Sequence, residues 1–381
     1  KNIKKNTDGR ISNVICNSAK MGLIPQRDYF DKDIANSDNT SGYYIIEHND
    51  FVYNPRKSSD APYGPISRYA YPDAGIVSPL YLCFRAKGDV DTNFFEWYFR
   101  SSAWHRYIYM TGDSGARHDR VSIKDDDFFS MPIRFPSSIE QKKIASFLNA
   151  IERRISSQQF LVDNLKKYKR GVFEAIFSRT LRLMPRTSQS EWTAFKLSDF
   201  ATRITRKNNG ATDIPLTISA QYGLIDQRDF FSKVVASTDM SGYYLLHRGE
   251  YAYNRSTSND YPFGSIKRLD LYDKGAVSTL YLCFAIKEEV VLSDFARWYF
   301  ESSQWYRGVN EICAEGARNH GLLNVPTDGF FNTVHILPSD IEEQSRIAAF
   351  LSRIHEKVIQ AQEELDELNS LRKGLMQQLF I

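Results

Sequence analysis

The chain has 381 residues, enough for two or three domains that each bury a core. Aromatic residues make up 14% and charged residues 25% of it, a composition typical of a folded protein and not of a disordered one. The formal net charge of +3 is too small to indicate a nucleic-acid-binding protein by overall charge. Any positively charged binding surface must therefore be local.

The four cysteines do not form a redox or metal-binding motif. Cys83 and Cys283 occupy matching apolar segments, while Cys16 and Cys313 lie elsewhere, and none has CxxC spacing. We expect reduced thiols. No run of 18 apolar residues and no signal-peptide pattern is present, so we expect a cytoplasmic protein.

The sequence is internally duplicated. Residues 41–44 (Ser-Gly-Tyr-Tyr) recur at 241–244, and residues 80–84 (Leu-Tyr-Leu-Cys-Phe) recur unchanged at 280–284. Such a repeat predicts two similar structural units. The second copy is preceded by an amphipathic segment, residues 191–200, that has no counterpart before the first. We therefore expect the first copy to lack its N-terminal residues.

Each copy is predicted to be a mixed α and β domain, spanning 1–136 and 191–337. Short apolar segments separated by Asn, Asp, Gly or Pro indicate short strands joined by turns. Residues 77–84 and 277–284 are apolar and predict a central strand in each copy. Residues 91–110 then change to the helical spacing of large aromatic side chains.

A long helix is expected after each domain, over 137–178 and 338–381. Proline ends the preceding strand at Pro136 and Pro338, and capping and acidic residues follow. Apolar side chains then recur with strict 4,3 spacing, which favours a coiled coil. Its expected core positions are Ile144, Leu148, Ile151, Ile155, Val162, Leu165, Ile347, Leu351, Ile354, Val358, Leu365 and Leu368.

The two helices are expected to pair with each other, antiparallel, within one chain, with residues 179–190 as the linker. The predicted fold class is α+β and pseudo-twofold, with one domain at each end of the helix pair. From Ile144 to Ile176 the helix advances about 32 steps of ~1.5 Å, or roughly 48 Å. Two domains this far apart can contact one DNA duplex about one ~34 Å turn apart. Gln158, Lys169 and Arg372 are the polar positions that can fix the register of the coiled coil.

No catalytic motif is found. The sequence has neither a Walker-type phosphate loop, nor GxGxxG after a strand, nor HExxH or another paired-histidine metal site. Asn54-Pro55 resembles the start of the Asn-Pro-Pro-aromatic motif of amino-methyltransferases, but Arg56 follows it and the second copy reads Asn254-Arg255. We therefore expect neither a catalytic nor a metal site.

Two loops in each copy carry Arg, Asn and Ser beside aromatic residues, which are side chains suited to base edges and phosphates. They are 53–60 and 115–120 in the first copy, and 253–260 and 316–320 in the second. A polar surface turn is the alternative for any one residue alone. The candidate DNA-binding residues are Asn54, Arg56, Lys57, Ser58, Arg68, Arg117, His118, Arg120, Asn254, Arg255, Ser256, Lys267, Arg268, Arg318, Asn319 and His320.

The order of these motifs resembles the specificity subunit of type I restriction–modification systems, over nearly the whole chain. Both domains are followed by the pattern Pro-x-x-Ile-Glu-(x)-Gln-x-x-Ile-Ala-x-Phe-Leu. The matching residues are Pro136, Ile139, Glu140, Gln141, Ile144, Ala145, Phe147 and Leu148, and Pro338, Ile341, Glu343, Gln344, Ile347, Ala348, Phe350 and Leu351.

The resemblance implies two target recognition domains that each read one half of a bipartite double-stranded DNA sequence. It implies no catalysis and no bound cofactor in this chain. It also implies assembly with two modification subunits, which use S-adenosylmethionine to methylate adenine, and with restriction subunits that use ATP and Mg²⁺.

Two alternatives remain open from the sequence. One is the specificity subunit of a related system whose partner chain both cuts and methylates. The other is a bivalent scaffold that binds two proteins and no DNA. Salt-sensitive DNA binding in the presence of a methyltransferase partner would exclude the scaffold.

Overall fold

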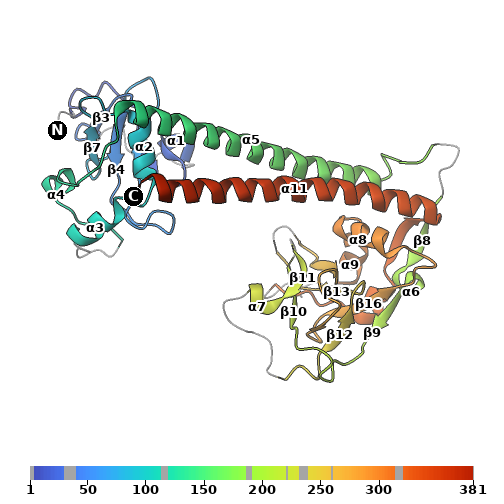
Figure 1. Cartoon of the computed structure of the whole chain (residues 1–381). Helices are drawn as coiled ribbons and strands as arrows, with labels where there is room; N and C mark the ends of the chain where they lie inside the picture. Colours follow the sequence, from blue (N-terminus) through green and yellow to red (C-terminus); the bar gives the residue numbers. More distant parts are fainter. Residues whose placement is uncertain are drawn as a thin grey trace. The chain divides into compact units, whose positions relative to one another are not determined.

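The computed structural model describes residues 4–29, 40–112, 119–185, 191–219, 222–230, 239–258, 261–313 and 321–380 (Figure 1). The chain divides into two compact units: unit 1 comprises residues 1–160 and 362–381, and unit 2 comprises residues 161–361. Each unit therefore contains one predicted domain together with a part of both long helices, α5 (Ser138–Phe177) and α11 (Ile341–Leu379).

Unit 1 is built from short strands and short helices, α1 to α4, that precede α5. A three-stranded antiparallel sheet has the order β5-β4-β7, and two further strand pairs, β1-β2 and β3-β6, accompany it. The elements are β1 (Ile15–Ser18), β2 (Gly22–Pro25), α1 (Gln26–Tyr29), β3 (Tyr44–Ile46), β4 (Asp50–Tyr53), β5 (Ile66–Arg68), β6 (Gly75–Val77), β7 (Leu82–Arg85), α2 (Thr92–Arg100), α3 (His105–Thr111) and α4 (Asp125–Phe129).

Unit 2 repeats this order and adds a lead-in and a closing strand. Its main sheet has four strands in the order β14-β13-β16-β9, and β17 pairs with β8. The elements are β8 (Trp192–Lys196), α6 (Leu197–Phe200), β9 (Ala201–Ile204), β10 (Leu216–Ser219), β11 (Gly223–Asp226), α7 (Gln227–Phe230), β12 (Tyr244–His247), β13 (Tyr251–Asn254), β14 (Ser265–Arg268), β15 (Lys274–Val277), β16 (Leu282–Ile286), α8 (Ser293–Glu301), α9 (Tyr306–Ile312), α10 (Thr327–Phe331) and β17 (Val334–Pro338).

The predicted strands over 77–84 and 277–284 are wrong in detail. Each is two strands separated by a turn, at 78–81 and 278–281, so β6 and β7 pair with different neighbours. A Ser at the first turn position, with Pro79 after it in the first copy, accounts for the break. In unit 1, β7 is an edge strand, whereas β16 of unit 2 lies between β13 and β9.

Aromatic side chains fill the main core of each unit. In unit 1, Phe51 packs against Phe84 and Phe95 with ring centroids 5.5 and 5.0 Å apart. In unit 2, Tyr251 stacks on Phe284 at 5.3 Å, so the matching positions use the same packing. Asp91 is the N-cap residue of α2. Its carboxylate accepts hydrogen bonds from the backbone N–H groups of Asn93 and Phe94, both 3.0 Å long.

The heptad prediction is confirmed, because all twelve expected core positions are buried or half-buried along α5 and α11. The pairing is antiparallel. In unit 1, Arg372 donates to Glu152 at 2.9 Å and Arg154 pairs with Glu364. In unit 2, Lys169 Nζ lies 3.0 Å from His355 Nδ1. The expected polar positions Arg372 and Lys169 thus make cross-helix contacts.

None of the described helices is both long and apolar enough to cross a lipid bilayer.

One glycine in each unit lets the chain fold back over the end of the main sheet. Gly64 and Gly264 have φ of +81° and +78°, and a Cβ on either would lie 2.1 Å from the carbonyl oxygen of Asn54 or Asn254. Nearby, the buried Tyr53 and Tyr253 hydroxyls donate to the carbonyls of Tyr63 and Phe263, at 2.9 and 2.8 Å. These contacts therefore fix the position of the loop that begins at Asn54 in unit 1 and at Asn254 in unit 2.

A buried histidine lies in the core of unit 2. His335, on β17, is 3% exposed, and its ring nitrogens lie 3.0 Å from the Tyr299 hydroxyl and 2.8 Å from the Thr333 hydroxyl. Burial lowers the pKa of His335 to about 4, because the charged ring would lose its hydration. The folded state thus holds the neutral imidazole at neutral pH.

Replacing Gly64 or Gly264 by Ala should destabilise the fold by more than the backbone conformation alone requires. Gly88 and Gly249 are matched controls, with φ of +68° and +89° and no atom within 4 Å of the added Cβ. The controls should lose roughly 1–2 kcal/mol, and Gly64→Ala and Gly264→Ala roughly 1–3 kcal/mol more. Urea unfolding measures the difference; equal losses at all four positions would refute the close-approach argument.

The acid sensitivity of unit 2 should depend on His335. Because its pKa is lowered on folding, its contribution to stability is present above pH ~6.5 and lost as the pH falls towards 4. The wild-type free energy of unfolding should fall by roughly 2–3 kcal/mol more than that of His335→Gln between pH 7 and 4.5. His247→Gln, the same exchange at an exposed histidine, is the matched control. Parallel pH curves for wild type and His335→Gln would contradict the prediction.

Candidate nucleic-acid interface

The two predicted loops of each copy meet in the structure. In unit 1, the Lys57 N–H donates to the Asp119 carbonyl at 2.8 Å, and the Val121 N–H donates to the Pro55 carbonyl at 2.9 Å. These two bonds join the loop after β4 to the segment before α4. Although 64 residues separate Arg56 from Arg120, the two are directly opposite each other as an antiparallel bridge.

Unit 2 forms the same short ladder. The Thr257 N–H donates to the Gly321 carbonyl at 2.7 Å, and the Leu323 N–H donates to the Arg255 carbonyl at 3.0 Å. In both units the asparagine before the ladder also closes a local turn. Its side-chain oxygen accepts from the N–H two residues on, in Arg56 at 3.1 Å and in Ser256 at 3.0 Å. We call these two structures the loop ladders; each lies at the end of the main sheet.

The cations of the first loop ladder are accessible. Arg56 is exposed, and its 3.6 Å ion pair with Asp119 joins two side chains that are 66% and 50% exposed. Such a pair contributes little to stability, so Arg56 remains available to a ligand. Lys57 is half-buried and Ser58 is exposed. Arg120 is half-buried, and its Nε is a buried donor with no acceptor among the described residues.

The second loop ladder carries its arginine one position earlier. Arg255 stands where the first copy has Pro55, and Ser256 where it has Arg56. The Arg255 Nη2 donates to the Leu280 carbonyl at 2.9 Å, and its Nε is buried without a hydrogen-bond partner in the described structure. A guanidinium has five N–H groups, so three on the terminal amines remain. The Nε end of the Arg255 side chain is therefore held in place, whereas its terminal amino groups can donate further hydrogen bonds.

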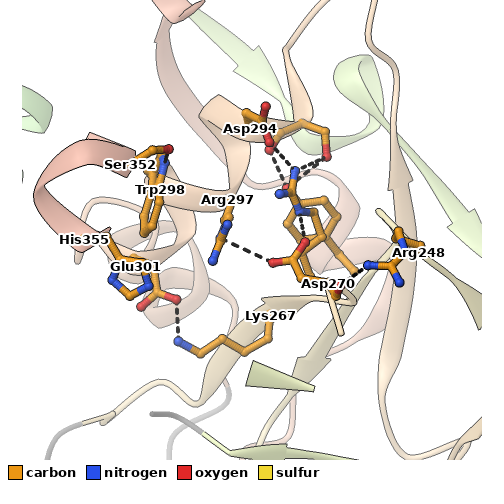
Figure 2. A network of polar contacts seen from close by, with 12 residues as sticks. Arg248, Lys267, Asp270, Asp294, Arg297, Trp298, Glu301, Ser352 and His355 are labelled. Carbon is orange, nitrogen blue, oxygen red and sulfur yellow. Dashed lines mark hydrogen bonds and ion pairs between the residues drawn. The ribbon is translucent and has the colours of Figure 1, made fainter. Parts of the chain in front are cut away.

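Three of the predicted DNA-binding residues, Arg68, Lys267 and Arg268, are paired with carboxylates inside the fold. Arg68 donates to Glu96 at 2.7 Å and Arg268 to Asp270 at 2.6 Å, with arginine side chains 16% and 12% exposed. Figure 2 shows the Lys267 amine directed at Glu301, 2.5 Å away, and this lysine side chain is 7% exposed. Sequence reasoning placed all three on the DNA surface because it had no sign of the carboxylates on α2 and α8. Their low exposure and their carboxylate partners point to a structural role inside each unit.

Five predicted residues lie outside the described residues: Arg117, His118, Arg318, Asn319 and His320. They belong to the segments that lead directly into the ladder strands at Asp119 and Gly321. The DNA-binding role of these five stays a prediction.

Beside the first loop ladder the surface is hollowed, a feature that sequence reasoning missed. The hollow has a volume of about 560 Å³, and its walls include Tyr44, Pro55, Leu80, Tyr81 and Phe129. The unpredicted turn at 78–81 forms one side of it. The Ser-Pro pair inside an apolar segment was the signal for this turn.

Among the described residues, neither Cys83 nor Cys283 is an activated nucleophile beside the loop ladders, and no metal site is formed there. Burial raises the pKa of both Cys83 and Cys283 to about 12, so these residues stay thiols at neutral pH. In the described part of the chain, no three His, Cys, Asp or Glu side chains gather as metal ligands. The arrangement can donate hydrogen bonds and attract anions.

Solved structures share this architecture along almost the entire chain. A chain from a structure described as the basis of complex assembly and conformational transition of the type I R-M system is 15% identical, with a TM-score of 0.56, covering 99% of this chain and 94% of that one. The HsdS subunit from Thermoanaerobacter tengcongensis is 15% identical (TM-score 0.50; 99% and 93% covered). The type I restriction–modification S subunit from M. genitalium is 13% identical (TM-score 0.51; 100% and 93% covered).

No protein-family model and no curated protein sequence matches the chain. Identities of 13–15% establish the fold alone. The chain therefore has the fold of type I restriction–modification S subunits, with two mixed α/β domains and an antiparallel pair of long helices.

Proposed function

We propose that this chain is the DNA-specificity subunit of a restriction–modification complex, and that each unit binds one half of a bipartite double-stranded DNA target. The observation that carries the proposal is the loop ladder, which both units form from the same two loops. Each ladder presents an arginine at the end of the main sheet, where Arg68, Lys267 and Arg268 are already paired with carboxylates. The fold shared with S subunits supports the same assignment.

Base reading by this surface would rest on arginine. A guanidinium can donate two parallel hydrogen bonds to guanine O6 and N7, a contact that discriminates against other bases by about 1–3 kcal/mol. Arg255 is suited to this contact because its stem is fixed by burial and by the Leu280 carbonyl. In unit 1 the exposed Arg56 takes this role, with Lys57 and Arg120 as phosphate contacts.

The two half-sites should differ in sequence. The first ladder has Pro55-Arg56-Lys57 and the second has Arg255-Ser256-Thr257, so the guanidinium enters from a different backbone position in each. A perfect palindrome would need equivalent contacts on both sides. We therefore propose a bipartite target whose two halves differ in sequence.

Catalysis is assigned to partner subunits. The proposal includes two modification subunits that use S-adenosylmethionine to methylate adenine, and restriction subunits that use ATP and Mg²⁺. This chain would hold none of these groups and would position its partners on the DNA in the cytoplasm. The heptad-patterned helices would set the spacing between the half-sites.

Substitution of Arg255 and of Arg56 should each change recognition at one half-site only. Arg255→Lys keeps the positive charge but loses the planar, two-donor edge, so it should lower discrimination at one guanine by roughly 5- to 150-fold. Arg255→Ala should do the same and also weaken the salt dependence of binding. Arg56→Lys and Arg56→Ala should act in the same way on the other half-site.

The assay is modified-base sequencing of DNA from cells that express each variant with the modification partner, together with binding by the purified complex at several salt concentrations. The unchanged half-site is the internal control in every experiment. If all four variants methylate the wild-type sequence, the loop ladders do not read DNA. If the wild-type complex binds no DNA in a salt-sensitive manner, the chain is a protein scaffold instead.

A further inference from the structure

The turn between β6 and β7 in unit 1 has the same hydrogen bonds as the turn between β15 and β16 in unit 2. The Tyr81 N–H donates to the Ser78 carbonyl at 3.0 Å, and the Tyr281 N–H donates to the Ser278 carbonyl at 3.1 Å. The serine hydroxyls accept from the N–H groups of Leu80 and Leu280, at 3.3 Å in each unit. Two hydrogen bonds thus fix the backbone of each leucine.

The strand register places both turns beside the loop ladders. Leu82, the first residue of β7, pairs with Tyr53, the last residue of β4 before the loop. In unit 2, Leu282 likewise pairs with Tyr253, next to Asn254. The turns therefore lie at the ladder end of each sheet.

Direct contacts agree with this placement. The guanidinium of Arg255 bonds to the carbonyl of Leu280 itself, at 2.9 Å. In unit 1, Leu80 lines the same hollow as Pro55 and Val121, which are bonded to each other in the loop ladder.

Both leucines present their side chains to solvent. Leu80 is 62% and Leu280 58% exposed, whereas the residues at the two ends of the turn, at 78 and 81 or 278 and 281, are half-buried. A single exposed leucine has no special meaning. Here, however, the same apolar residue is exposed at the matching position of two domains, although the exposed residue before it differs, Pro79 against Thr279, and so does the adjacent loop, Pro55 against Arg255. The fold does not need an exposed leucine at this turn.

We propose that Leu80 and Leu280 are specificity-determining residues that contact the 5-methyl group of a thymine in their respective half-sites. The proposal rests on the proposed function. The chemistry follows from the neighbouring arginine: where Arg255 reads a guanine edge in the major groove, the side chain next to it faces an adjacent base pair. The apolar group exposed by base pairs in that groove is the thymine methyl. Each half-site should therefore contain an A·T pair next to the arginine-read position.

The test uses the purified complex of the chain with its modification partner and duplexes that carry the wild-type target. Uracil replaces each thymine of the target in turn, which removes only the 5-methyl group. In each half-site one replacement should weaken binding roughly fourfold, the factor that burying one methyl-sized group supplies. Leu280→Ala should cause a similar loss on unmodified DNA and abolish the uracil effect in one half-site only. Leu80→Ala should do the same in the other.

Leu271→Ala is the matched control. Leu271 is 58% exposed, as Leu280 is. It follows β14 beyond Arg268, which pairs with Tyr251, at the sheet end away from the ladder. This variant should bind as wild type and keep the uracil effect in both half-sites.

Two results would overturn the inference while leaving the proposed function intact. One is a sequence-specific wild-type complex whose half-sites tolerate uracil at every thymine. The other is a uracil effect that persists in Leu80→Ala and Leu280→Ala. A wild-type complex with no sequence-specific binding would instead overturn the proposed function, and this inference with it.

Discussion

A buried glutamine at the start of each long helix ties the mixed α and β domain to the helix, and the rest of each unit depends on it. In unit 1, the Gln141 amide accepts from the Asp91 N–H at 2.9 Å and donates to the Pro136 carbonyl at 2.9 Å. In unit 2, Gln344 accepts from Leu292 at 2.8 Å and donates to Pro338 at 2.9 Å. Loss of either amide would leave buried backbone groups unpaired, at about 1–3 kcal/mol each.

The same link continues eight residues, about two helical turns, further along each long helix. The indole N–H of Trp97 donates to Asn149 at 2.9 Å, and that of Trp298 donates to Ser352 at 3.0 Å. Two side-chain bonds thus fix α2 on α5 in unit 1 and α8 on α11 in unit 2. Because α2 and α8 also pack on the main sheet, the orientation of each loop ladder follows from its long helix. Under the proposed function, this link would let the long helices determine where the loops meet DNA.

The duplication separates what the fold requires from what is free to change. The glutamines, the core aromatics and the ladder hydrogen bonds are equivalent in the two units. The polar pairs between the two long helices are not equivalent. Arg372 and Glu152 form an ion pair in unit 1, while the matching positions in unit 2 hold Lys169 and His355. Burial lowers the pKa of His355 to about 4, so its ring is neutral and can accept from the lysine. Different charges can thus satisfy the same helix pair.

Most of the architecture could be predicted from the sequence, because repetition and heptad spacing are periodic signals. The turn at 78–81 was missed, because the apolar residues around it have the composition of a strand and only the Ser-Pro pair indicates a turn. The ion pairs of Arg68, Lys267 and Arg268 depend on carboxylates brought near by folding, which linear spacing does not reveal. The meeting of the two loops, from segments more than 60 residues apart, needed the strand register.

The measurement that tests the central claim most directly is modified-base sequencing of DNA from cells that express this chain with its modification partner. The account predicts methylated adenines in two short, different specific blocks separated by a spacer of fixed length and free sequence. Methylation at a single continuous motif, or at a perfect palindrome, would contradict the account.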